Sequence, residues 1–89
     1  MYYVYMLKNK SNQLYIGVSE NVQQRVQNHN DHRGAQFTKN PSKFLLVFIE
    51  PYSTLAQARA REIQLKKWRR EKKEILIGRY QAGLSTKSR

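Results

Sequence analysis

The chain has 89 residues, 39% of them hydrophobic, which is enough for one small domain with a modest core but not for two. Its 17 Lys and Arg against 6 Asp and Glu give a formal charge of +11, which disfavours folding through self-repulsion and favours a polyanionic partner. The absence of cysteine excludes disulfides and thiolate metal sites. We expect nucleic acid as the partner. An acidic membrane surface and an acidic protein are the alternatives, and ribosomal proteins share this size and charge.

The N-terminal segment predicts a hairpin. Only seven residues precede the first lysine, too few for a signal peptide or a membrane span, so we expect a soluble, cytoplasmic protein. "YYVYMLK" is aromatic and β-branched and predicts a strand over 2–8. "NKSNQ" is turn chemistry, and "LYIGV" resumes the strand pattern over 14–18, so the two strands should pair antiparallel. Gly17 within the second strand indicates close backbone approach or a bend next to a site.

The middle of the chain predicts a helix, a loop and a third strand. Asn21 can cap a helix that runs over about 22–30. A polar loop follows over 30–43. The apolar run "KFLLVFIE", residues 43–50, is too short for a typical helix and predicts a strand covered on both faces, ended by Pro51.

Two helices should follow the third strand. Ser53 or Thr54 can cap the first, which runs over about 55–68. A short helix over 71–78 would be closed by Gly78.

The element order is therefore β-β-α-β-α-α. It predicts an α+β fold in which a three-stranded antiparallel sheet is flanked by helices. We expect the domain to cover 1–80 and the polar residues 81–89 to form a flexible tail.

One acidic residue, Glu62, stands among apolar residues on a single face of the long helix. The residues on that face are Leu55, Ala58, Glu62 and Leu65. A buried carboxylate is costly unless it is paired or bound to a metal ion. An ion pair with a neighbouring cation satisfies this requirement as well as a metal does, and the candidates are Arg59, Arg61 and Lys66.

Other polar side chains fall close together in the predicted fold. Arg25 and His29 are four residues apart on the first helix and share a face, where they can contact phosphate and share a proton, or can be two solvated residues. Tyr5 and Tyr15 would be near neighbours across the hairpin, either as site residues or as half-buried packing residues.

Basic residues are dense in the second half of the chain. Eight Lys and Arg fall between Arg59 and Lys73, with Trp68 among them. This density favours contacts with a phosphate backbone over a merely solvated coat.

Taken in order, these residues resemble the GIY-YIG nuclease superfamily, and more narrowly its small single-domain bacterial members of uncharacterised function. The first motif reads "YVY" at residues 3–5 and the second "YIG" at 15–17. Arg25 follows ten residues after Tyr15, and "RVQNHN" and "REIQLKKW" match the later patterns. Two departures are that Tyr3 stands in place of the first glycine and that no asparagine follows Asn40, where many members carry a late one. Either Glu74 or a nearby lysine could take the place of that asparagine, and the sequence does not decide between them.

The resemblance implies a metal-dependent endonuclease that hydrolyses phosphodiester bonds. Glu62 would hold one Mg²⁺ or Mn²⁺ ion, and Arg25 would clamp the phosphate. Tyr5 or Tyr15 would be the general base, with a slight preference for Tyr5, and the other tyrosine would orient the water. His29 would shuttle a proton or bind the phosphate. The expected substrate-binding residues are Gly17, Lys66, Lys67, Arg69, Arg70, Lys72 and Lys73.

The expected partner is nucleic acid, DNA before RNA, with activity that is weak or depends on a protein partner for specificity. The alternatives are a non-cleaving nucleic-acid-binding module on the same scaffold and a ribosome-associated structural protein.

Overall fold

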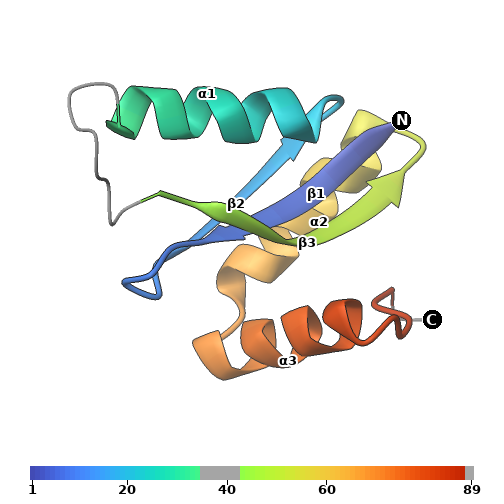
Figure 1. Ribbon diagram of the computed structural model, residues 1–89. Helices are drawn as coiled ribbons and strands as arrows, with labels where there is room; N and C mark the ends of the chain where they lie inside the picture. Colours follow the sequence, from blue (N-terminus) through green and yellow to red (C-terminus); the bar gives the residue numbers. More distant parts are fainter. Residues whose placement is uncertain (35–42, 88–89) are drawn as a thin grey trace.

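The structure, a computed structural model, describes residues 1–34 and 43–87 (Figure 1). Residues 35–42 of the predicted loop and the last two residues of the tail lie outside the described residues. The elements, in chain order, are β1 (Tyr2–Lys8), β2 (Leu14–Ser19), α1 (Val22–Gly34), β3 (Leu45–Tyr52), α2 (Leu55–Lys67) and α3 (Arg70–Gln81). The predicted order β-β-α-β-α-α and the α+β class are confirmed.

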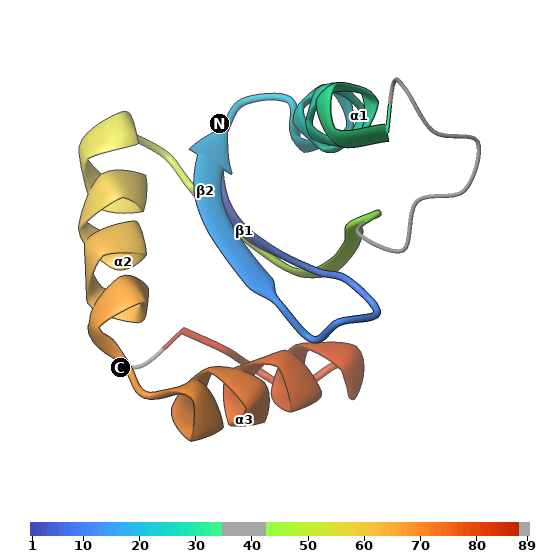
Figure 2. The same ribbon diagram turned by 90° about the vertical axis from the view of Figure 1, so that its left-hand side faces the viewer.

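The three strands form one antiparallel sheet in the order β2-β1-β3. β1 is central, and its residues alternate between two cores. Val4 and Met6 belong to a core with α2 and α3, whereas Tyr5 and Leu7 belong to a smaller core with α1, and all four are at most 1% exposed. Helix α1 therefore covers one face of the sheet, and α2 and α3 cover the other (Figure 2).

The prediction that β3 is covered on both faces is wrong at its beginning. β3 is an edge strand, and Leu45 and Leu46 are 62% and 40% exposed. The prediction that Pro51 ends the strand is also wrong, because β3 continues to Tyr52. Proline is tolerated at this position because an edge strand has one side whose N–H groups need no partner strand.

Helices α1 and α2 begin at predicted caps. The Asn21 side chain accepts a hydrogen bond from the backbone N–H of Gln24, and Thr54 and Gln57 form a reciprocal capping box at the start of α2. Helix α1 continues to Gly34, beyond the predicted end. No helix within the described ranges is long and apolar enough to cross a membrane.

The prediction that Gly78 closes the third helix is wrong, because α3 ends at Gln81. The glycine that ends it is Gly83, whose φ of +78° lies in the left-handed region. The N–H of Leu84 donates to the carbonyl of Arg79 at 2.9 Å, and the N–H of Gly83 donates to that of Tyr80 at 3.0 Å. This pair of bonds is a Schellman motif, which satisfies carbonyls at the helix end and reverses the chain.

Candidate active site

Two phenols from neighbouring strands lie together on the α1 face of the sheet. Tyr5 of β1 pairs in register with Gly17 of β2, and the ring centroids of Tyr5 and Tyr15 are 6.2 Å apart. A Cβ atom at position 17 would lie 2.7 Å from the Tyr5 hydroxyl oxygen and 3.2 Å from a ring carbon of Tyr15. The predictions that the tyrosines are neighbours and that Gly17 marks a close approach are therefore confirmed.

The two phenols differ in environment. Tyr5 is 1% exposed, whereas Tyr15 is 36% exposed. Burial raises the pKa of Tyr5 above its ordinary value of 10.0, and the neighbouring Tyr15 raises it further. The charge and hydrogen bonding of Arg25 lower the pKa of Tyr5 but do not outweigh these effects. Tyr5 therefore keeps its proton at neutral pH, and the exposed phenol of this pair is that of Tyr15.

Helix α1 brings the predicted guanidinium and imidazole to the same place. The His29 ring centroid lies 4.8 Å from that of Tyr15 and 4.8 Å from that of Phe44. Arg25, four residues before His29, acts electrostatically on the Tyr5 hydroxyl. Four of the five predicted catalytic residues therefore lie in one cluster.

Glu62, the fifth, comes from α2, which packs on the other face of the sheet (Figure 2). Its Oε1 pairs with Nη1 of Arg59 at 3.2 Å, and its Oε2 pairs with Nζ of Lys66 at 3.0 Å. Burial opposes ionisation, but the hydrogen bonds from Lys66 and Arg59 outweigh it and lower the pKa of Glu62. Within residues 1–34 and 43–87, no hydrogen bond or ion pair joins Glu62 to the Tyr5–Tyr15 pair. Leu55, expected on the same buried face, is 42% exposed.

The side chains that could bind a metal ion are sparse in the described part of the chain. No group of three or more His, Cys, Asp or Glu side chains in the described part of the chain could hold an ion. A hard cation such as Mg²⁺ can nevertheless be held by one carboxylate, with water and substrate oxygens completing its shell. Glu62 fits this arrangement because its carboxylate is ionised and the two side chains that pair with it are about half exposed, at 56% and 55%. It fits only as a single protein ligand.

The basic residues expected to bind substrate divide into two groups. Three are already engaged: Lys66 with Glu62, Arg70 with Glu74, and Lys72 over the ring of Trp68 at 4.2 Å. The other three have no ion-pair partner among the described residues, and they are Lys67, Arg69 and Lys73.

Glu74 is not a free substitute for the late asparagine. Its two carboxylate oxygens pair with Lys8 and Arg70, each at 2.7 Å, and Arg70 also donates to the backbone carbonyl of Asn12. These contacts tie α3 to the first strand and to the turn after it, so Glu74 serves the fold.

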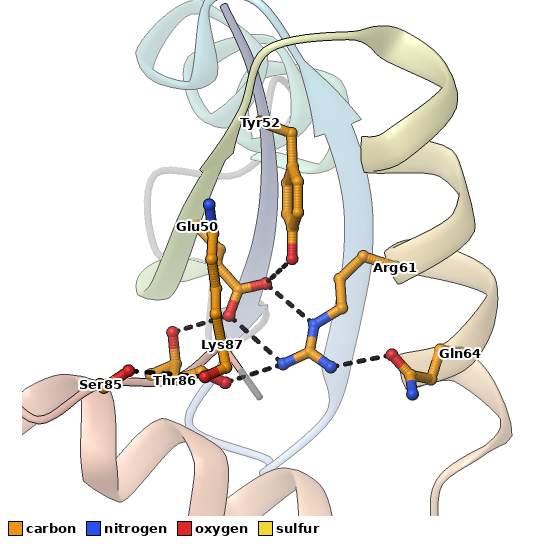
Figure 3. Close-up of polar contacts among 7 residues, drawn as sticks. All are labelled: Glu50, Tyr52, Arg61, Gln64, Ser85, Thr86 and Lys87. Carbon is orange, nitrogen blue, oxygen red and sulfur yellow. Dashed lines mark hydrogen bonds and ion pairs between the residues drawn. The ribbon is translucent and has the colours of Figure 1, made fainter. Parts of the chain in front are cut away.

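A buried ion pair that was not predicted from the sequence joins Arg61 of α2 to Glu50 of β3 (Figure 3). The two side chains are 7% and 1% exposed, and Nε of Arg61 lies 2.9 Å from Oε1 of Glu50. Tyr52 and Thr86 donate further hydrogen bonds to Glu50, each at 2.7 Å, and Arg61 also donates to Gln64 and to the Thr86 carbonyl. Arg61, one of the three predicted candidates for an ion pair with Glu62, faces β3 and pairs with Glu50 instead.

The sequence contains little that could have revealed this network. Glu50 ends an apolar run, and an acidic residue inside a predicted buried strand was the one usable signal. Thr86 lies in the segment predicted to be a polar, flexible tail, yet the Schellman turn at Gly83 directs it back to the sheet. The flexibility of residues 81–89 as a whole stays a prediction.

The fold and the cluster together define a small α+β domain with a phenol, guanidinium and imidazole site at one face of its sheet. The chain belongs to the GIY-YIG family: residues 1–74 match the family described as the GIY-YIG catalytic domain. Such domains are typically endonucleases, generally use a divalent metal, and are associated with nucleic-acid binding.

Relatives of this chain are small bacterial proteins. UPF0213 protein SH2523 of Staphylococcus haemolyticus is 39% identical over 76 residues, which are 85% of this chain and 93% of that protein. UPF0213 protein YazA of Bacillus subtilis is 38% identical over 76 residues, 85% of this chain and 77% of that protein. The solution NMR structure of UPF0213 protein BH0048 from Bacillus halodurans is similar with a TM-score of 0.56 and 32% identity, covering 88% of this chain and 84% of that one.

Proposed function

We propose that this protein is a metal-dependent endonuclease that hydrolyses phosphodiester bonds in nucleic acid, with DNA as the preferred substrate. The observation that carries the proposal is the convergence of Tyr5 and Tyr15 over Gly17, beside Arg25 and His29. This cluster holds two groups that can hydrogen-bond a water molecule, one fixed positive charge for a phosphate, and one group that exchanges protons near neutral pH.

In this proposal the roles follow from burial and charge. Tyr15, the exposed phenol, takes a proton from the attacking water and gives its own hydroxyl proton to the neighbouring imidazole of His29, while the water oxygen bonds to phosphorus and the bond to the leaving oxygen breaks. Tyr5, buried and protonated, donates a hydrogen bond that orients Tyr15 or the water. Arg25 binds a nonbridging oxygen, and its contact strengthens as charge builds up in the transition state. His29 passes a proton toward the leaving oxygen. The general base in this proposal is Tyr15 and not Tyr5, because Tyr5 is buried and its pKa is raised.

Glu62 would hold one divalent ion, Mg²⁺ or Mn²⁺. When bound, such an ion supplies positive charge to the phosphate and the leaving oxygen. For Glu62 to act there, its carboxylate must exchange Arg59 and Lys66 for the ion, and the substrate must reach the side of the sheet on which α2 lies. Lys67, Arg69 and Lys73, which have no ion-pair partner in the described chain, would contact the phosphate backbone.

The proposal is tested by a cleavage panel. Supercoiled plasmid, single-stranded DNA and structured RNA are incubated with purified protein in Mg²⁺, in Mn²⁺ and in EDTA. Three variants, Tyr15→Phe, Arg25→Gln and Glu62→Gln, are prepared in parallel. We expect metal-dependent cleavage by the wild type and a loss of about 100-fold or more in each variant, the usual size of an acid–base or electrostatic contribution. Equal products from the wild type and Glu62→Gln would mean contamination and would overturn the proposal.

A second candidate function is a nucleic-acid-binding module that does not cleave. The ion pairs of Glu62 with Arg59 and Lys66 favour it, because they satisfy the carboxylate without a metal. Salt-dependent binding of an oligonucleotide that persists in Glu62→Gln, with no cleavage in either metal, would select this function.

A further inference from the structure

The two oxygens of Glu62 each have their own cation. Arg59 contacts Oε1 and Lys66 contacts Oε2, one from the preceding and one from the following turn of α2. The Glu62 side chain is 10% exposed, whereas those of Arg59 and Lys66 are 56% and 55% exposed. The carboxylate is therefore covered by two side chains that themselves lie largely in water.

This arrangement differs from the other buried carboxylate of the chain. Glu50 and Arg61 are both nearly inaccessible to solvent and are held by further hydrogen bonds, so separating them would leave buried charges unpaired. Arg59 and Lys66 can instead swing into solvent on long flexible stems, and exposed ion pairs of this kind add little net stability. The cations on Glu62 are the ones that can leave.

The net charge around Glu62 determines when Arg59 and Lys66 would leave its carboxylate. The three side chains carry two positive charges against one negative. A divalent cation on Glu62, with Arg59 and Lys66 still in place, would concentrate positive charge within about two turns of one helix, which is repulsive. A phosphodiester chain supplies the negative charge that removes this repulsion, and Arg59 and Lys66 are matched to it once they are released from the carboxylate.

We propose that Arg59 and Lys66 act as exchange partners of Glu62: they hold its carboxylate when metal is absent, and they transfer to nucleic-acid phosphates when a divalent cation binds. Metal and nucleic acid then bind cooperatively. By linkage each must tighten the binding of the other by the same factor. This inference rests on the proposed function, because it takes Glu62 as the metal ligand, and it adds Arg59 to the residues that contact substrate.

The test measures metal binding rather than cleavage. Free Mn²⁺ is quantified by electron paramagnetic resonance during titration of the protein, with and without a saturating single-stranded DNA dodecamer of thymidylate. The variants are Arg59→Gln/Lys66→Gln, called the exchange variant, and the matched control Lys10→Gln/Lys43→Gln. The control removes the same charge from exposed positions that lie outside the proposed site and have no ion-pair partner among the described residues. Glu62→Gln reports the Mn²⁺ that the DNA holds by itself, and thermal unfolding verifies that each variant is folded.

Without DNA, we expect Arg59→Gln/Lys66→Gln to bind Mn²⁺ about tenfold more tightly than the wild type, and more tightly than the control pair. With DNA, the wild type and the control should gain at least about fivefold in Mn²⁺ affinity, the lower end of ordinary coupling, whereas the exchange variant should gain about twofold or less. Equal Mn²⁺ affinities in the exchange variant and the control would overturn the inference, and so would equal gains from DNA.

Failure of this inference can be told apart from failure of the proposed function. If Glu62→Gln abolishes both cleavage and Mn²⁺ binding while the exchange variant behaves like its control, the nuclease assignment holds and the exchange is wrong. If Glu62→Gln binds Mn²⁺ as tightly as the wild type, Glu62 is not the metal ligand and both are wrong.

Discussion

The Thr86 hydroxyl donates a hydrogen bond of 2.7 Å to Oε2 of Glu50, a carboxylate that is 1% exposed on the third strand. Nη2 of Arg61 reaches both partners, at 3.3 Å from the same Glu50 oxygen and 3.0 Å from the Thr86 carbonyl. The matched domain covers residues 1–74, so a residue beyond it completes a polar network inside the fold (Figure 3). The end of the chain thus contributes to the stability of the sheet and of α2.

Thr86→Val should therefore destabilise the protein although it lies in a terminal segment. Removing the hydroxyl leaves an oxygen of Glu50 with one donor fewer, and we expect a loss of about 1–2 kcal/mol in the free energy of unfolding. Urea denaturation at neutral pH measures it. Ser85→Ala is the control, since that hydroxyl makes only a long, exposed contact, and a loss of equal size in the control would contradict the prediction.

Acid should weaken the fold through the same carboxylate. Burial alone would raise the pKa of Glu50, but hydrogen bonds from Arg61, Thr86 and Tyr52 outweigh it and hold the pKa below its ordinary value of 4.5. A depressed pKa in the folded state contributes stability above the unfolded value, and that stability is lost as pH falls through the folded value. We expect the unfolding free energy to fall steeply below about pH 4.5, as linkage requires.

Glu62 and Glu74 also have lowered pKa values, so the acid effect is shared among three carboxylates. Urea titrations of Thr86→Val across this pH range isolate the part that belongs to Glu50. The variant should show a shallower loss than the wild type, because one hydrogen bond that favours the ionised form is gone. Parallel curves would contradict this attribution.

Tyr5 should ionise at a higher pH than an ordinary phenol. Its pKa is raised by burial, so the folded protein keeps the phenol neutral at a pH where the unfolded chain loses the proton. Ultraviolet difference titration at alkaline pH follows tyrosine ionisation, and the difference between wild type and Tyr5→Phe gives the curve of Tyr5. We expect this curve to be centred above pH 10 and the fold to lose stability as pH rises from about 10 through it. A Tyr5 curve centred below pH 10 would contradict the prediction.

Two glycine substitutions should change the free energy of unfolding in opposite directions. Gly17→Ala places a methyl group 2.7 Å from the Tyr5 hydroxyl, in a packed site where the ring has little room, and we expect a loss of about 1–3 kcal/mol as in overpacked cores. Gly78→Ala meets nothing within 4 Å inside α3 and should gain about 0.5–1 kcal/mol from helix propensity. Thermal unfolding compares the two. A neutral Gly17→Ala would show that the phenol is not held in place there.

Local patterns were sufficient to predict most of the fold. Alternation and aromatic content located β1 and β2, and the side-chain caps Asn21 and Thr54 located the starts of α1 and α2. The errors lie where tertiary position decides. An edge strand tolerated Pro51, and Gly83 rather than Gly78 ended α3, because a glycine stops a helix only when it adopts the left-handed conformation.

The candidate site was predictable to the extent that its residues are local. Hairpin register brings the tyrosines together, and helical spacing aligns Arg25 with His29. Arg61 and Glu62 are consecutive residues of α2, and the sequence does not show which of them faces Glu50. That choice depends on the rotation of the helix about its axis against β3. That rotation is a tertiary property, and the partner residues are separated by 11 and 36 positions in the chain.

The chain reversal after α3 has a practical consequence for anyone handling this protein. Lys87 lies over the ring of Tyr52, one residue beyond the threonine that closes the Glu50–Arg61 pair. A shortened version that stops before Thr86 would leave both side chains of that buried pair with fewer hydrogen bonds. Assays on such a truncated preparation would therefore report on a weakened scaffold.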